Sequence, residues 1–369
     1  MIFDLDESRL DDVEALSVAD PGEMLRTVAT SGAQIRRALT LTAESDLDRL
    51  VSDGLPRSVV VTGSRTSDLV ARLLPVLAGT AARIPVLPLT SLPAWVGAMD
   101  VVVAISVSGS TPATLATVEE AGRRGARVLT VGPRNTPLEN VSLQVRGVHI
   151  DPDLVDRPAR ASFWSLAVPP LRLMDAWDLV PASADSLDTI ADLMDDVAER
   201  CGPTVDLLTN PAKAVAVEIA GSLPVLVGAT PLSAFAAQYF AANLASDAGY
   251  PSSVALSDVS ALFTGAFGDA AAESGQPDDF FRDRIEDDEV GMRVRLVLLS
   301  DVSPDTSDDR LRRAAEDRGV GVSELRAVGT QPLERVATLT ALSDFVSVYL
   351  ALALGVDPTR TPLDTLEMP

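Results

Sequence analysis

The chain contains very little cysteine, histidine and lysine. Its 369 residues include one cysteine, one histidine and one lysine, which are Cys201, His149 and Lys213. A single cysteine excludes an internal disulfide and a metal cluster built from cysteines, and we expect neither a metal nor a cofactor. Only 4% of the residues are aromatic whereas 47% are hydrophobic, so the core must consist largely of alanine, valine and leucine.

Positive charge is also scarce. The 30 lysine and arginine residues face 53 aspartate and glutamate residues, which gives a formal net charge of −23. This charge argues against nucleic-acid partners and anionic membranes, because both would be repelled. A small phosphate ligand is compatible with it, since backbone dipoles and single arginines act locally whereas the field of the whole protein is screened. We interpret the acidic stretches 4–14 and 278–289 as solvated faces.

Long apolar runs are missing as well. No window reaches the ~20 unbroken apolar residues of a membrane span. The N-terminal sequence MIFDLDESRL lacks the basic start and the apolar core of a signal peptide. We therefore expect a cytoplasmic protein that spans no membrane.

The sequence does contain an alternation of short apolar strands with helical stretches. We expect strands at residues 58–62, 86–89, 101–105, 127–131, 145–150, 223–228, 294–300 and 325–328, and helices at 69–77, 112–121, 187–199, 232–244, 310–318 and 333–354. This order is typical of the α/β class, with doubly wound parallel sheets and right-handed crossovers. We predict an N-terminal helical segment (1–54), a first α/β domain (55–182), and a linking helix with a second α/β domain (183–369).

The most informative stretch follows the strand at 101–105, where residues 106–111 read SVSGST before a helix begins at Pro112. A helix N-terminus offers free backbone N–H groups and the positive end of the helix dipole, so it binds anions. Hydroxyl groups can add hydrogen bonds to phosphate oxygens. Gly63 and Ser64 follow the strand at 58–62, and ligands of such sheets bind beyond the carboxyl ends of the strands. A serine-rich helix cap without a ligand is the alternative interpretation.

These features resemble a sugar isomerase (SIS) domain, and in particular the bifunctional phosphoglucose/phosphomannose isomerase family. That family's loop reads S-x-S-G-N-T where this chain has SVSGST at 106–111. Further similar segments are LPAWV at 92–96, RPARA at 157–161, YLA at 349–351 and GVDP at 355–358. The resemblance covers residues 59–358 and implies two tandem SIS-type domains.

The resemblance also implies roles for individual residues. The phosphate of the ligand would contact Ser64, Ser106, Ser108, Gly109, Ser110 and Thr111, and Arg160 would contact the sugar. Ser110 stands at the family's asparagine position. The implied ligand is a hexose phosphate, and the implied assembly is a homodimer.

The chain departs from the family at the groups that move protons. The position of the family's catalytic glutamate is Leu244 here, the region of its histidine reads DVSA at 258–261, and its lysine corresponds to the pair 366–367. Aldose–ketose isomerisation needs a carboxylate base and acid–base groups that open the ring. Asp247 and Asp258 are the nearest carboxylates in sequence, and together with His149 they are the candidate substitutes.

Two functions stay open on these grounds. One is a hexose 6-phosphate-binding protein that has lost the groups of proton transfer and has weak or no catalytic activity. The other is an active glucose 6-phosphate or mannose 6-phosphate isomerase with rewired acid–base residues. An amidotransferase would need a glutaminase module with an N-terminal cysteine, and a nucleotide-binding dehydrogenase would need a G-x-G-x-x-G turn after an early strand.

Overall fold

The computed structural model describes residues 6–154, 158–255, 293–301 and 306–360. Contacts divide them into two compact units. The first unit holds the described residues from 26 to 198 together with 331–337, and the second unit holds those in 1–25, 199–330 and 338–369. The predicted boundaries at 54/55 and 182/183 both fall inside the first unit, and the division into independently folding domains stays a prediction.

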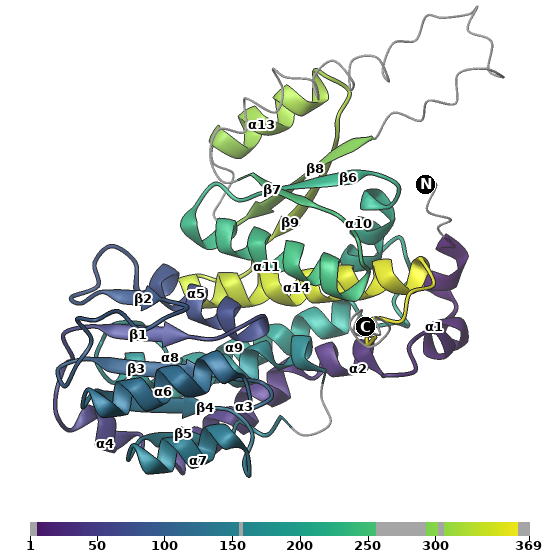
Figure 1. Cartoon of the computed structure of the whole chain (residues 1–369). Helices are drawn as coiled ribbons and strands as arrows, with labels where there is room; N and C mark the ends of the chain where they lie inside the picture. The colour runs from purple at the N-terminus through teal and green to yellow at the C-terminus, as the bar shows by residue number, and fades with distance from the viewer. Residues whose placement is uncertain (1–5, 155–157, 256–292, 302–305, 361–369) are drawn as a thin grey trace, which may run out of the picture. The chain divides into compact units, whose positions relative to one another are not determined.

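The first unit is built on a five-stranded parallel sheet (Figure 1). Its strands are β1 (Val59–Thr62), β2 (Val86–Pro88), β3 (Val101–Ile105), β4 (Arg127–Val131) and β5 (Val148–Ile150), in the spatial order β2-β1-β3-β4-β5. Every residue of β1 and β3 is buried, as expected for central strands of a parallel sheet that is covered on both faces.

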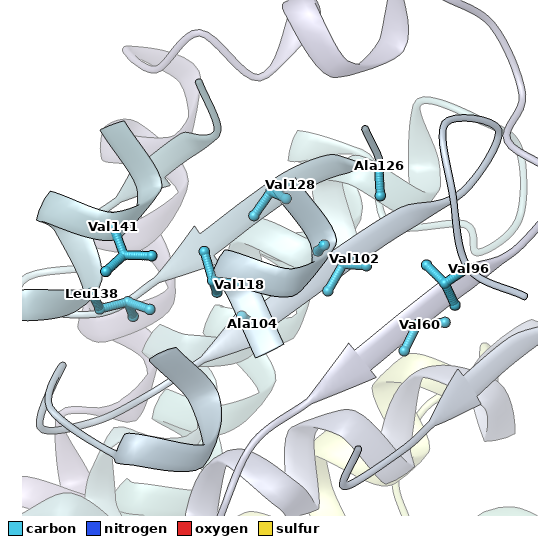
Figure 2. Packing of buried hydrophobic residues seen from close by; sticks show 10 residues of the cluster. Val60, Val96, Val102, Ala104, Val118, Ala126, Val128, Leu138 and Val141 are labelled. Atoms are coloured by element: carbon cyan, nitrogen blue, oxygen red, sulfur yellow. The ribbon is translucent and has the colours of Figure 1, made fainter. Parts of the chain in front are cut away.

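Helices cover this sheet and complete its core. They are α2 (Met24–Ala29), α3 (Ser31–Ala43), α4 (Asp48–Val51), α5 (Thr66–Ala78), α6 (Pro112–Arg123), α7 (Pro137–Gln144), the 3₁₀ helix η2 (Ala159–Ser162), α8 (Phe163–Asp175) and α9 (Ala184–Arg200). Both α6 and α7 begin with a proline, whose fixed φ suits the first helical position. Their Val118 and Leu138 pack with Val102 and Val128 of the sheet (Figure 2).

The second unit contains a four-stranded parallel sheet in the order β7-β6-β8-β9. Its strands are β6 (Leu223–Val227), β7 (Ser253–Ala255), β8 (Val294–Ser300) and β9 (Gly321–Arg326). Its helices are η1 (Glu7–Asp11), α1 (Val13–Ala19), α10 (Pro211–Ile219), α11 (Pro231–Asp247), α13 (Thr306–Glu316) and the part of α14 (Pro332–Ala353) from residue 338 onward.

The two sheets share one connection order. In each sheet, the first strand along the chain lies between the second and the third, and the fourth strand follows the third. The predicted fold class, α/β with two parallel sheets of the doubly wound type, is confirmed, and a helical part precedes the first strand.

The strand expected at 325–328 is the main difference from the prediction. β9 instead covers Gly321–Arg326 and pairs with β8 from Arg295 to Ser300. The polar residues Ser323 and Glu324 interrupt the apolar pattern that would otherwise indicate this strand in the sequence. Because β9 is an edge strand, side chains of neighbouring elements can reach both: Arg295 donates to the Ser323 hydroxyl at 3.0 Å, and Arg312 bonds Glu324 at 2.6 Å.

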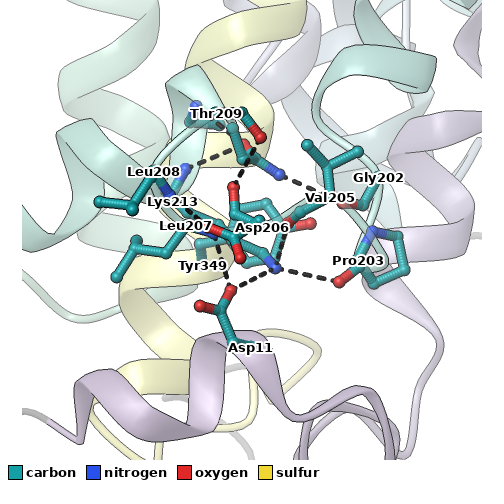
Figure 3. A network of polar contacts seen from close by, with 12 residues as sticks. Asp11, Gly202, Pro203, Val205, Asp206, Leu207, Leu208, Thr209, Lys213 and Tyr349 are labelled. Carbon is teal, nitrogen blue, oxygen red and sulfur yellow. Dashed lines mark hydrogen bonds and ion pairs between the residues drawn. The ribbon is translucent and has the colours of Figure 1, made fainter.

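Lys213 is fully buried near the start of α10 in the second unit. Its ammonium group donates to the carbonyl oxygens of Pro203 and Val205 at 3.0 and 2.7 Å and lies 3.3 Å from Asp11 (Figure 3). Burial lowers the pKa of this ammonium group, against the opposing effect of Asp11. The only lysine of the chain therefore ties η1 to the loop before α10 and has a structural role.

Helix α14 is long and apolar enough to cross a membrane by length and composition. All of its apolar window is buried inside the structure, as in the core helix of a soluble fold. The apolar composition of α14 is therefore explained by its burial inside the protein.

Candidate functional site

The loops that follow β1 and β3 lie side by side at the carboxyl ends of the strands of the first sheet. The two strands are parallel neighbours, and Thr62 pairs with Ala104 at the end of their shared register. Adjacent strands lie about 4.8 Å apart, so Gly63–Ser64 and the loop 106–111 emerge side by side. In the order β2-β1-β3-β4-β5 this is the place where the chain direction across the sheet reverses, and ligands of doubly wound folds bind there.

The loop 106–111 is held by its own hydroxyl groups. Ser106 is 2% exposed, its N–H donates to the Val131 carbonyl at 3.0 Å, and its Oγ accepts the Gly109 N–H at 3.1 Å. Oγ1 of Thr111 lies 3.2 Å from the same Ser106 Oγ. Ser108 and Ser110 are exposed and bonded to each other at 3.1 Å.

Thr111 is the residue before α6, yet its side chain forms no capping hydrogen bond with the helix. Most N-cap hydroxyls bond the N–H groups of the first turn, whereas this one turns toward Ser106. The first turn of α6 therefore keeps its backbone donors for another acceptor. This geometry favours an anion site over the plain helix cap.

Gly109 allows the tight turn in this loop. Its φ is +62°, and a Cβ atom at this position would lie 2.6 Å from Cβ of Thr136 in the loop after β4. Its carbonyl accepts the N–H of Leu138 at 2.9 Å. The loop after β3 is thus pressed onto the start of α7, and only glycine fits there.

Ser67 is a candidate that the sequence motifs did not single out. It lies in the first turn of α5, it is 1% exposed, and its Oγ has no hydrogen-bond partner among the described residues. A Cβ atom on Gly63 would lie 2.6 Å from Cβ of Ser67, so this hydroxyl sits directly over the end of β1. A buried hydroxyl without a partner is costly, and a ligand oxygen would satisfy it. Ser64 itself is exposed.

Arg160 lies in η2, which packs against α5 and α8 in the same unit. The structure places it on a segment next to the helix that follows Ser64. Its predicted contact with a sugar stays a prediction.

His149 lies on the edge strand β5, as expected. The register joins it to Thr130 and Thr130 to Ala104, so it is two strand spacings, about 10 Å, from β3. Its Nδ1 lies 2.9 Å from the Thr130 hydroxyl. Burial lowers the pKa of its imidazole, against the opposing effects of Glu139 and Asp151. The contact with Thr130 fits a structural histidine, whose Nε2 is buried without a hydrogen-bond partner among the described residues.

Of the two candidate carboxylates, the structure describes Asp247 and not Asp258. Asp247 ends α11 in the second unit, is 2% exposed and accepts a hydrogen bond from Ser347 at 2.7 Å. Asp258 lies outside the described residues, as do the family's histidine and lysine regions. Leu244, at the position of the family's glutamate, is fully buried in α11.

A second buried carboxyl, Asp344 of α14, lies close to Asp247. It accepts hydrogen bonds from Tyr239 at 2.8 Å and from Asn243 at 2.6 Å. Burial and the charge of Asp247 hold the pKa of Asp344 well above its usual value, despite these two hydrogen bonds. The carboxyl is therefore stabilised in its protonated form.

The LPAW segment lies at the amino ends of the strands of the first sheet, whereas the loop 106–111 lies at their carboxyl ends. It leads into the start of β3, where Arg57 bonds the buried Asp100 at 3.0 Å and lies 5.6 Å from the Trp95 ring. Burial alone would raise the pKa of Asp100, but hydrogen bonds from Arg57, Gly97 and Ser58 hold it below its usual value. This motif therefore has a structural role.

The corresponding edge of the second sheet has different chemistry. After β6, Thr230 caps α11 through a reciprocal pair of hydrogen bonds with Ser233. The Thr230 hydroxyl also donates to Asp301, which follows β8, at 2.8 Å. A capped helix start beside a carboxylate does not suit a phosphate.

Two surface hollows formed by described residues are not lined by the loop 106–111. One of about 670 Å³ lies in the second unit beside Arg9, Val18 and Asp357, and one of about 340 Å³ lies beside Pro75, Arg83 and Leu87. Within the described ranges, no group of three or more His, Cys, Asp or Glu side chains has the arrangement of a metal site.

Comparison with known proteins shows which proteins this chain resembles. Residues 208–365 match the family described as the bacterial phospho-glucose isomerase C-terminal SIS domain. A bifunctional phosphoglucose/phosphomannose isomerase of Caldicellulosiruptor bescii is 24% identical over 307 residues, which cover 82% of this chain and 85% of that protein. The chain is an SIS-domain protein that resembles these isomerases.

Solved structures agree with the SIS-type fold. The C-terminal domain of glucosamine-fructose-6-phosphate aminotransferase from Francisella tularensis is similar with a TM-score of 0.65 at 12% identity, over 91% of this chain and 97% of that one. Glucosamine-6-phosphate deaminase from Thermotoga maritima is similar with a TM-score of 0.62 at 12% identity, over 92% and 97%. At such identities the likeness establishes the fold and leaves the reaction to the site residues.

We predict that Gly109→Ala destabilises this SIS-domain protein by about 2–4 kcal/mol, since positive φ and overlap with Thr136 each cost about 1–2 kcal/mol. Gly125→Ala is the matched control, because Gly125 has φ of +77° but meets only Ala98, at 3.7 Å. Urea unfolding of both variants measures the difference. Equal losses of stability would contradict the close packing of the loop 106–111.

We predict that Asp344→Asn changes how stability depends on pH. A carboxyl whose folded pKa is raised stabilises the protein fully below its unfolded pKa, and this contribution is lost as the pH rises through the folded value. The asparagine variant lacks that loss, so relative to wild type it should gain stability between pH 4 and 8. Asp100→Asn should show the opposite trend, because the pKa of Asp100 is lowered. Unfolding free energies from pH 4 to 8 test the sign for Asp344, and those below about pH 5, where a lowered carboxyl pKa affects stability, test it for Asp100.

Proposed function

We propose that this SIS-domain protein binds a hexose 6-phosphate at the edge formed by Gly63–Ser67 and the loop 106–111. The observation that carries the proposal is the arrangement of Ser106 and Thr111. Their hydroxyls face each other at 3.2 Å, and the start of α6 is left without a side-chain cap. Ser67, with a buried hydroxyl that lacks a partner, adds a donor from the neighbouring loop.

We further propose that the protein has weak or no isomerase activity. Three groups among the described residues that could move protons have hydrogen-bond partners within the fold: His149 Nδ1 with Thr130, Lys213 with backbone carbonyls, and Asp247 with Ser347. Leu244 cannot act as a base. On this proposal, the chain keeps the SIS-type fold and the phosphate loop and lacks the usual proton-transfer groups. A homodimer in the cytoplasm is the expected setting and stays a prediction.

The alternative is an active aldose–ketose isomerase for glucose 6-phosphate or mannose 6-phosphate. The likeness to a bifunctional phosphoglucose/phosphomannose isomerase favours it. Catalysis would then need a base from a carboxylate such as Asp247 or Asp258, each with a shorter reach than glutamate. A displacement of about 1 Å at a reacting group can cost roughly a hundredfold in rate.

Binding is tested by thermal unfolding and calorimetry with fructose 6-phosphate and glucose 6-phosphate. Both ligands should raise the unfolding temperature, and Ser106→Ala or Thr111→Val should reduce affinity about tenfold or more, because each removes a hydrogen bond to a charged group. Ser300→Ala is the matched control, a buried serine at the end of β8 in the second sheet. Absence of binding by wild type to any hexose phosphate would contradict the proposal.

Catalysis is tested by a coupled assay for interconversion of glucose 6-phosphate and fructose 6-phosphate. Wild type should show turnover at or near background at saturating substrate. Turnover well above background would establish the alternative function, and Asp247→Asn and Asp258→Asn would then identify the base. Binding without turnover supports the non-catalytic function.

A further inference from the structure

Arg65 stands in a backbone conformation that arginine rarely adopts. It is the residue before α5, with φ of +54° and ψ of −122°. The Ser67 N–H donates to the Ser64 carbonyl at 3.1 Å, so residues 64–67 form a tight turn with Arg65 at its second position. Glycine is preferred there. The turn itself therefore does not call for an arginine.

The side chain of Arg65 is exposed, and no hydrogen bond or ion pair joins it to any residue that the structure describes. Neighbouring charges do not engage it. Asp68, the acidic residue in the first turn of α5, bonds Arg72 at 2.7 Å instead. A free cation thus stands between Ser64 and Ser67, in a chain whose formal net charge is −23.

A buried hydroxyl at this point indicates a ligand. The start of α5 has no side-chain cap, but its Ser67 and Asp68 N–H groups already donate to the Ser64 and Arg65 carbonyls. The Ser67 hydroxyl, 1% exposed, lies in the same turn without a partner, and the neighbouring start of α6, which also has no side-chain cap, supplies further donors. A dianion at this edge would face donors from two helices and one guanidinium group.

We propose that Arg65 pairs with the phosphate group of the bound sugar and selects phosphorylated ligands. The inference rests on the proposed function and adds a specific counter-charge to it. A guanidinium group donates two parallel hydrogen bonds to phosphate oxygens. It also offsets locally the repulsion that an acidic protein exerts on a dianion.

Four proteins test this role: wild type, Arg65→Gly, Arg65→Lys and Arg146→Gly. Arg146 is the matched control, because it is also exposed, has φ of +57° and lies before β5, at the other edge of the sheet. Both glycine variants relieve a positive φ and remove one positive charge. Thermal unfolding without ligand should show that neither loses stability.

Calorimetry then measures binding of fructose 6-phosphate, inorganic phosphate and fructose. Arg65→Gly should weaken binding of both phosphate ligands about tenfold, Arg65→Lys about threefold, and Arg146→Gly less than twofold. The dependence of affinity on salt should also become shallower in Arg65→Gly. Fructose should bind equally weakly to all four proteins.

The outcomes separate this inference from the proposed function. If wild type binds fructose 6-phosphate, and Arg65→Gly binds it as tightly as Arg146→Gly, the role of Arg65 is wrong while the site stands. If wild type binds neither phosphate ligand, both are wrong.

Discussion

Two helices begin where the neighbouring parallel strands β1 and β3 end, and neither helix start is capped by a side chain. Parallel pairing forces both starts to the same sheet edge, and the connection order makes them diverge there. The dipoles of both helices and the uncapped start of α6 therefore act on one small region. The pairing of β1 with β3 is what places the hydroxyls of the loop 106–111, the close approach at Gly109 and the buried Ser67 in the same region.

The second sheet has the same connection order, but the helix start after its first strand is capped by side chains of the protein itself. Thr230 and Ser233 cap α11, and Asp301 accepts the hydrogen bond that a phosphate would otherwise take. The two halves thus share a topology but differ in chemistry. A phosphate site depends on donors that stay unpaired, such as the Ser67 hydroxyl of the first unit, whereas Thr230 and Ser233 at the corresponding helix start of the second unit are paired with each other. The fold alone would not distinguish them.

Much of the secondary structure could be predicted, because buried parallel strands are continuous apolar runs. The strands at 101–105, 127–131 and 294–300 were predicted with the bounds that the structure gives. The predicted bounds of β9 were wrong, since Ser323 and Glu324 are polar and find their hydrogen-bond partners on other elements. Ser67 was missed because a serine in the first turn of a helix is common, and only its burial without a partner makes it unusual.

The sequence by itself determined the α/β class, the apolar strands and the hydroxyl-rich turn at 106–111, because each is written in a short local pattern. It also determined that the chain has a single histidine and a single lysine, since counting residues needs no structure. Only the tertiary structure decided the order of the strands and the neighbours of each polar group. Gly63 and Ser106 come together through pairing over more than 40 residues of chain, which no local periodicity encodes. The burial of Lys213 and the left-handed turn at Arg65 likewise depend on contacts that form only in the folded chain.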